Sequence, residues 1–199
     1  MLGHKCLVGG NGLYGLALAI ERCGRLPVSA LDIGELAVGP QGKALYLGLS
    51  VFPDCDDSIP CTVKRLDARA ADKASGLIFD QVFIRHWDTW KDGRRSHVFT
   101  LPAGGGEPVD VMAGMDADCP AKPFGGPEDY TFAPDNHSIV FAARDAGADE
   151  PWSTNFDIYV THAKKQINLT EDNEAWDAHP VFSPDGTRLA WQSMLRPGF

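Results

Sequence analysis

A short hairpin motif near the C-terminal end restricts the fold more than any other feature. Residues 181–191 read V-F-S-P-D-G-T-R-L-A-W, a four-residue turn between two short apolar runs. Pro184 sets φ at the second turn position, Asp185 accepts backbone hydrogen bonds, and Gly186 takes the positive φ that closes the loop. The flanking runs are rich in residues typical of strands. The segment therefore predicts a β-hairpin.

Two upstream segments follow the same plan. Residues 130–141 read Y-T-F-A-P-D-N-H-S-I-V-F, with Asn136 in place of glycine because asparagine tolerates a left-handed backbone. Residues 36–47 are a weaker copy, with a G-P-Q-G turn. The turn residues of the copies are Pro40, Gly42, Pro134, Asp135, Pro184, Asp185 and Gly186. The recurrence indicates a repeat architecture.

The spacing of the copies indicates the kind of repeat. The turn prolines at positions 40, 134 and 184 are separated by 94 and 50 residues. A period of about 40–50 residues is typical of a four-stranded propeller blade, and the longer first gap leaves room for a missed blade or an insertion. We therefore predict an all-β fold, a partial β-propeller of about two and a half four-stranded blades with one helical insertion.

The blades are expected within a propeller domain that spans 31–199. The first covers 36–112 and contains the insertion at 52–94, the second covers 130–169, and the third covers 180–199 and is cut after two strands. Typical propellers need at least about four blades to close a ring. The chain is therefore expected to be a fragment with an open, incomplete propeller.

The insertion shows two patterns. Apolar residues recur at roughly helical spacing over 62–75, with charged residues between them, and Gly76 follows as a C-cap. Further on, 81–91 and 94–101 flank an Asp-Gly turn, which predicts a second hairpin. The insertion is thus expected to hold a short amphipathic helix and the first strand of this hairpin. The returning strand at 98–101 is expected to be a strand of the blade, with the role that 157–160 has in the next blade.

Composition excludes several function classes. The formal net charge of −9, spread along 199 residues, disfavours a nucleic-acid partner. No apolar stretch approaches the ~18 residues of a membrane-spanning helix. The histidines and cysteines show no metal-ligand spacing, so we expect no metal and no cofactor. The 21 glycines and 14 prolines suit a turn-rich β protein.

The five cysteines offer one candidate disulfide. Cys55 and Cys61 close the short loop C-D-D-S-I-P-C. A bridge between them is plausible in an oxidising compartment. The alternative is a pair of reduced loop cysteines.

Residues 1–30 allow three interpretations. Gly10, Gly12 and Gly15 match the G-x-G-x-x-G pattern of dinucleotide-binding folds, and Asp32 lies 22 residues after the first of them. The strand before the motif is short, however, and no alternating β-α pattern follows. A dinucleotide-binding protein is therefore kept as one alternative function.

The second interpretation of this end is a degraded secretory signal. Lys5 precedes the apolar run at 13–20, and small residues follow near Ala30, but Glu21 and Arg22 interrupt the pattern. The third interpretation is an irregular start. The three remain open.

Longer segments carry a family resemblance. The stretches F-S-P-D-G-T-R-L-A-W-Q-S-M-L-R-P-G-F, R-H-W-D-T-W-K-D-G-R-R-S-H-V-F-T-L and W-S-T-N-F-D-I-Y-V resemble the N-terminal β-propeller of prolyl oligopeptidase-family serine peptidases. Within that family the chain is most similar to the bacterial dipeptidyl-peptidase and acylaminoacyl-peptidase-like members. The resemblance covers about 31–199.

The resemblance implies a two-domain parent, in which the propeller sits over an α/β-hydrolase domain with Ser, Asp and His. Such a propeller filters substrates by size and helps to hold the peptide N-terminus. No serine of this chain lies in a G-x-S-x-G elbow, so no catalytic residue is assigned and the chain alone is expected to be inactive. A non-enzymatic TolB-like binding propeller is the main alternative function.

The resemblance also implies substrate-binding residues. Dipeptidyl peptidases hold the substrate ammonium with an acidic pair from the propeller, and Asp149-Glu150 has the chemistry for it. The alternative is two solvated loop acids. Arg85 or Arg144 would donate hydrogen bonds to a substrate carbonyl or carboxylate, or else form surface ion pairs. The tryptophans would line a peptide channel or, as we prefer, pack between blades.

The expected partners are a peptide substrate and the hydrolase domain of the same parent. Open blade edges also predict self-association, because unpaired strands attract further strands. The resemblance and the signal-like start favour a periplasmic or secreted parent. Without a signal the protein would be cytoplasmic.

Overall fold

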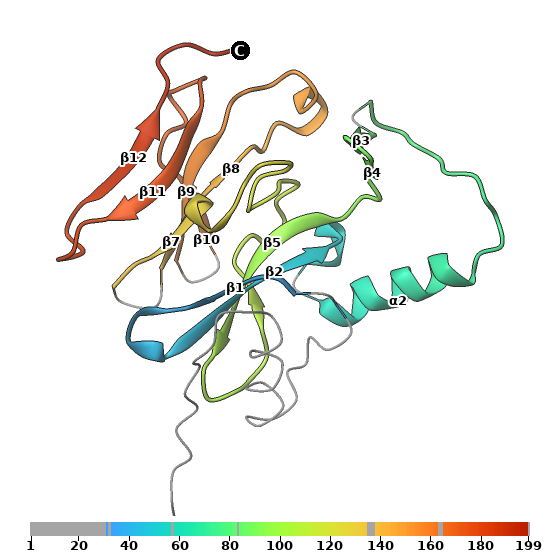
Figure 1. Cartoon of the computed structure of the whole chain (residues 1–199), viewed down its shortest axis with the longest axis horizontal. Coiled ribbons are helices and arrows are strands. Elements are labelled where there is room, and N and C mark those ends of the chain that lie inside the picture. Colours follow the sequence, from blue (N-terminus) through green and yellow to red (C-terminus); the bar gives the residue numbers. More distant parts are fainter. Residues whose placement is uncertain are drawn as a thin grey trace, which may run out of the picture.

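The computed structural model describes residue 31 and residues 33–56, 58–82, 84–134, 138–162 and 165–198. The glycine motif at Gly10, Gly12 and Gly15 lies outside the described residues, as does the turn residue Asp135. Within the described part, two four-stranded antiparallel sheets and a two-stranded sheet follow one another along the chain (Figure 1). The partial β-propeller predicted from the turns is confirmed.

The first blade has the strand order β1-β2-β5-β6. Its strands are β1 (Ile33–Val38), β2 (Ala44–Val51), β5 (Arg95–Pro102) and β6 (Val109–Asp110). The expected turn between β1 and β2 is present at Pro40–Gly42, where Gln41 and Gly42 have positive φ and the Gly39 amide donates to the Ala44 carbonyl. A proline followed by residues in the left-handed region reverses the chain within this short connection.

The second blade has the order β10-β9-β8-β7, and β11 and β12 form the third unit. The strands are β7 (Tyr130–Phe132), β8 (Ile139–Ala143), β9 (Asp157–His162), β10 (Lys165–Asn168), β11 (Asp177–Phe182) and β12 (Leu189–Ser193). In the last hairpin Gly186 has φ 70°, and the Asp185 carboxylate accepts hydrogen bonds from Thr187 and Ser183. The motif that suggested a hairpin therefore forms one.

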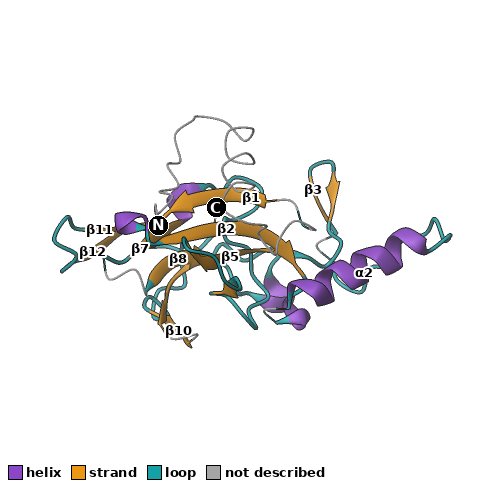
Figure 2. Cartoon of the chain, turned by 90° about the horizontal axis from the view of Figure 1, so that it is seen from below, coloured by secondary structure: helices purple, strands orange, loops and turns teal. Residues whose placement is uncertain are grey.

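The insertion of the first blade contains the helix α2 (Ile59–Ala71), which begins three residues before its predicted start. Ser58 caps it by accepting a hydrogen bond from the Cys61 amide, with a proline in the first turn. The helix stops at Ala71 rather than near Gly76, because the Asp72 side chain accepts a hydrogen bond from the Ala74 amide and the backbone becomes extended. Figure 2 shows α2 projecting from one end of the sheets.

The predicted pairing of 94–101 with 81–91 around the Asp92-Gly93 turn is wrong, whereas the predicted role of 98–101 as a strand of the first blade, equivalent to 157–160 in the second, is confirmed. Instead, β3 (Arg85–His86) pairs with β4 (Thr89–Trp90), and β5 pairs along its whole length with β2. Alternate side chains of β5 such as Phe99 and Leu101 are fully buried, so the strand needs sheet neighbours on both sides. A two-stranded hairpin within the insertion could not bury these side chains.

The apolar core lies mainly between blades. Tyr46 of the first blade stacks on Phe132 of the second with ring centroids 3.6 Å apart, above a buried cluster that includes Met112 and Phe141. A second cluster on the first blade receives Leu66 from α2. Tyrosine and phenylalanine rings therefore fill the space that we assigned to tryptophan.

The prediction that tryptophan rings pack between blades is wrong for four of the five tryptophans. Trp176 is half-buried against the cluster that joins the second blade to β11. The other four rings are largely exposed, with accessible fractions of 41–73%, and they are Trp87, Trp90, Trp152 and Trp191.

The residues that the structure describes include no helix able to cross a membrane and no cluster of metal-ligating side chains. The single α-helix among them is too short and too polar to cross a bilayer. No three metal-ligating side chains converge among these residues either.

Cys55 and Cys61 form a disulfide with their Cα atoms 5.7 Å apart, which joins the short 3-10 turn Pro53–Cys55 to the first turn of α2. Among the described cysteines only Cys119 is free, and it is buried.

We expect the tryptic peptide 44–64 of protein purified without reductant to be lighter by two hydrogen atoms than its reduced form. Mass spectrometry before and after reduction makes the measurement. A peptide that already has the reduced mass, and that takes up two alkyl groups without reductant, would contradict the bridge. Cys119 provides the internal control, since a buried free thiol should be alkylated only after unfolding.

Candidate functional site

The ends of two blades meet on one face of the molecule. In the first blade β2 ends and β5 begins at the pair Val51–Arg95, and in the second blade β8 ends and β9 begins at the pair Ala143–Asp157. The long connections at these ends are 52–94 and 144–156. Propeller loops of this kind carry binding residues because a rigid scaffold positions them.

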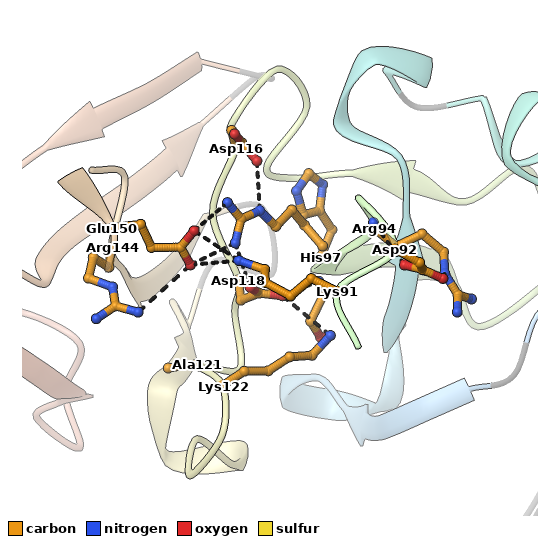
Figure 3. Close-up of polar contacts among 12 residues, drawn as sticks. Lys91, Asp92, Arg94, His97, Asp116, Asp118, Ala121, Lys122, Arg144 and Glu150 are labelled. Atoms are coloured by element: carbon orange, nitrogen blue, oxygen red, sulfur yellow. Dashed lines mark hydrogen bonds and ion pairs between the residues drawn. The ribbon is translucent and has the colours of Figure 1, made fainter. Parts of the chain in front are cut away.

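An ion pair between Arg95 and Glu150 joins the two blades at this face. The two guanidinium nitrogens Nη1 and Nη2 of Arg95 each donate to one carboxylate oxygen of Glu150 at 2.8 Å (Figure 3). Both side chains are buried, with 4% and 7% of their surface exposed. Bidentate pairing is the strongest and most directional geometry available to these groups.

Further charges surround the pair. Arg95 also donates to Asp116 at 2.6 Å and to Asp118 at 3.1 Å. Lys91 donates to Glu150 at 2.9 Å, and an Arg144 guanidinium nitrogen lies 3.7 Å from the same carboxylate. Figure 3 shows Glu150 between the cations of both blades. The charges nearly cancel, as buried ions require.

The protonation of the cluster follows from these contacts. Burial alone would raise the pKa of Glu150, but hydrogen bonds from Arg95 and Lys91 outweigh it and lower the pKa to about 2. Burial acts to lower the pKa of Arg95, and hydrogen bonds to Glu150 and Asp116 raise it above its ordinary value. Glu150 is therefore a permanent carboxylate near neutral pH.

A buried pair in the first blade positions the acids that Arg95 contacts. His97 Nδ1 lies 2.7 Å from the Asp110 carboxylate, and its Nε2 lies 3.1 Å from the Met115 carbonyl. The second oxygen of Asp110 accepts a hydrogen bond from the Met112 amide. The segment after β6 is thus held from both sides just before Asp116.

The second blade holds the same segment. The Thr161 hydroxyl and the Gln166 amide both donate to the Val111 carbonyl. Blade contacts on two sides therefore fix the direction in which the segment approaches Arg95.

The structure separates the predicted binding residues into two groups. Glu150 and Arg144 meet in the charged cluster, whereas Asp149 is exposed at the end of a 3-10 turn (Gly147–Asp149) and its carboxylate forms no ion pair in the described part. Arg85 lies outside the cluster, exposed on β3, with its guanidinium 5.6 Å from the ring centroid of Trp90. The solvated-acid interpretation fits Asp149 and is wrong for Glu150.

Sequence reasoning missed Arg95, Lys91 and the two aspartates of the first blade. Glu150 lies 55 residues from Arg95 and 59 from Lys91, and Asp116 and Asp118 lie 21 and 23 residues from Arg95, beyond any local pattern. A signal was present, since Arg95 and His97 are polar residues on a strand whose other buried residues are apolar. A charge at a buried strand position calls for a partner of opposite charge.

The interior of the cluster has no space for a ligand. Asp118, Ala121, Lys122, Arg144, Glu150 and Phe156 enclose about 10 Å³. That volume is about the size of one water molecule. The buried charges of the cluster therefore neutralise one another.

Comparison with known proteins finds relatives in sequence. The chain is 37% identical over 134 residues to dipeptidyl-peptidase 5 of Porphyromonas gingivalis and 34% identical over 135 residues to that of Porphyromonas endodontalis. Each match covers 64% of this chain and 19% of the relative. The chain thus spans about one fifth of these relatives' length.

Two further comparisons are weaker in sequence but longer. Dipeptidyl-peptidase 4 of Giardia intestinalis is 23% identical over 220 residues, covering 94% of the chain and 29% of the relative. A structure described as TolB from Agrobacterium tumefaciens aligns over 81% of this chain and 53% of its own, with a TM-score of 0.35 and 18% identity. No family model matches the chain.

The blades define the chain as a β-propeller segment. The sequence similarities relate it, more particularly, to the dipeptidyl-peptidases, and they confirm the resemblance seen in the sequence.

We expect Glu150→Gln to lower the free energy of unfolding by about 3 kcal/mol at pH 7, because it removes the bidentate anionic partner of the buried Arg95 guanidinium. Urea unfolding measures the change. Asp149→Asn is the matched control, since this exposed neighbour should change stability by less than about 0.5 kcal/mol.

The pH dependence provides a second readout of the same variant. The lowered pKa of Glu150 contributes stability above the ordinary value near 4.5, and this contribution is lost as pH falls toward about 2. The difference between the chain and Glu150→Gln should therefore shrink across that window. A difference that is constant from pH 7 to pH 3 would contradict the assignment.

Proposed function

We propose that the chain is the substrate-filtering propeller part of a serine exopeptidase that releases dipeptides from peptide N-termini. The observation that carries the proposal is the 37% identity to a dipeptidyl-peptidase over 134 residues. The reacting serine, histidine and aspartate would belong to a hydrolase domain of the same parent. The propeller would limit access to that domain and would bind the substrate's free ammonium.

The geometry of the blade-end face supports Asp149 as the residue that meets the ammonium. Its carboxylate is exposed and free of ion pairs in the described structure, so it can accept charge-assisted hydrogen bonds without losing a partner. The neighbouring Glu150 is anchored by Arg95 and Lys91. This anchor fixes the backbone of the loop, and a fixed loop holds an adjacent carboxylate with little entropic cost on binding.

The disulfide supports an oxidising location for the parent. Bridges such as Cys55–Cys61 persist in secreted and periplasmic proteins and are rare where thiols are kept reduced. We therefore place the proposed peptidase in the periplasm or outside the cell.

The test uses the product of the whole reading frame that contains this chain. We expect it to hydrolyse chromogenic dipeptide amides with a free N-terminus and to leave N-acetylated ones uncut. Asp149→Asn should lower kcat/KM for the free substrates about 10-fold or more, as expected for the loss of a hydrogen bond to a charged group. Asp172→Asn, an exposed aspartate elsewhere in the second blade, is the control.

Two results would count against the proposal. Equal cleavage of free and acetylated substrates would remove the role of an ammonium site. A reading frame with no G-x-S-x-G motif after Phe199, and a product that a fluorophosphonate probe does not label, would favour a binding propeller without peptidase activity.

A further inference from the structure

A groove of about 1110 Å³ lies beside the charged cluster, in the insertion of the first blade. Its walls are the C-terminal half of α2, the segment 72–81 that follows the helix, and the stretch 90–95. Figure 1 shows the chain leaving α2 in a wide arc before it returns to β3 and β4. The volume slightly exceeds that of typical small-molecule sites, about 300–1,000 Å³, and suits a length of peptide.

One wall of the groove exposes consecutive apolar side chains. Leu77, Ile78 and Phe79 have 68%, 98% and 37% of their surface accessible. Trp90 is 51% exposed, and its ring centroid lies 5.7 Å from that of Phe79. Contiguous exposed apolar groups of this kind mark interaction sites, because leaving them in water is costly.

The same wall has unused backbone hydrogen-bonding groups. Among the described residues, 75–82 form no backbone hydrogen bond and belong to no helix or strand. Backbone amides and carbonyls in this state can pair with an added extended chain, which is the mode of binding by strand addition. The wall thus offers a peptide both apolar contacts and main-chain partners.

The charges of the groove favour a basic occupant. The guanidinium groups that line it are engaged, since Arg69 donates to the Asp92 carbonyl at 2.6 Å and Arg94 to the Asp92 carboxylate at 2.7 Å. Asp56 and Asp80 also line it, are exposed, and have no ion pair in the described part of the chain. The lining as a whole is acidic, because six aspartates outnumber four basic residues in it: Asp54, Asp56, Asp72, Asp80, Asp92 and Asp116 against Arg69, Lys91, Arg94 and Arg95.

We propose that this groove binds an extended peptide segment in which apolar side chains alternate with basic ones. Apolar side chains contact Leu77, Phe79 and Trp90, the backbone pairs with 75–82, and the cations face Asp56 and Asp80. The natural occupant of the groove is the part of a peptide substrate beyond its N-terminus. This assignment of the occupant rests on the proposed function. The groove joins that site through Arg95, which lines the groove and holds Glu150.

The test measures fluorescence anisotropy of an acetylated, fluorescein-labelled hexapeptide of alternating leucine and arginine, titrated with the 199-residue chain. The acetyl group removes the ammonium, so binding reports on the groove and not on Asp149. We expect saturable binding, and none of a leucine-glutamate hexapeptide over the same range. Trp90→Ala should raise Kd about 10-fold and Asp80→Asn about threefold.

Matched controls are Trp191→Ala and Asp172→Asn, which remove an exposed indole and an exposed carboxylate outside the groove and should leave Kd unchanged. Circular dichroism checks that each variant is folded. Equal binding of both peptides, no binding, or equal effects of groove and control variants would overturn the proposal. So would a dimer, seen by sedimentation, that Ile78→Ser dissociates while the arginine peptide fails to bind. If the whole protein cleaves free dipeptide amides but the groove does not bind the arginine peptide, the groove proposal fails and the proposed function stands.

Discussion

The bidentate ion pair between Arg95 and Glu150 is the interaction on which the described face depends. Arg95 begins a central strand of the first blade, and Glu150 lies in the loop that connects β8 and β9 of the second. Neither charge tolerates burial alone, because an unpaired ion in a low-dielectric interior costs several kcal/mol. The pair therefore fixes the position of each blade end relative to the other.

The neighbouring groups acquire their roles from this constraint. Asp116 and Asp118 neutralise the remaining face of Arg95, and the pair His97–Asp110 holds the segment that carries them. On the other side, anchoring Glu150 leaves Asp149 exposed on a loop of fixed direction. One acid is thus buried in ion pairs and its neighbour is exposed, although the sequence presents them as an equivalent pair.

Local chemistry explains what could be predicted from the sequence. The S-P-D-G turn at 183–186 and its relatives specify hairpins by proline, aspartate and glycine at defined positions, and the hairpins are present in the described blades. The insertion helix is predicted by periodicity alone, but its ends differ from the periodic stretch because Ser58 caps the first turn and Asp72 ends the helix.

Long-range pairing explains what could not be predicted. The strand β5 pairs with β2 across the whole insertion, whereas the local pattern predicts the nearer segment 81–91, which an Asp-Gly turn connects to it, as its partner. The ion pair spans two blades, and tyrosine and phenylalanine rather than tryptophan fill the junction. These outcomes depend on which side chains meet after the sheets stack, and short-range patterns do not contain that information.

A double-mutant cycle on Arg95 and Glu150 tests the central claim most directly. Urea unfolding of the chain, Arg95→Met, Glu150→Gln and the double variant gives the coupling free energy at pH 7. The structure predicts that the double variant is more stable than the sum of the single effects by about 2 kcal/mol, since each single variant leaves the other member of the pair buried without it and the double variant does not. Additive effects within about 0.3 kcal/mol would contradict a direct interaction between the two blades at this point.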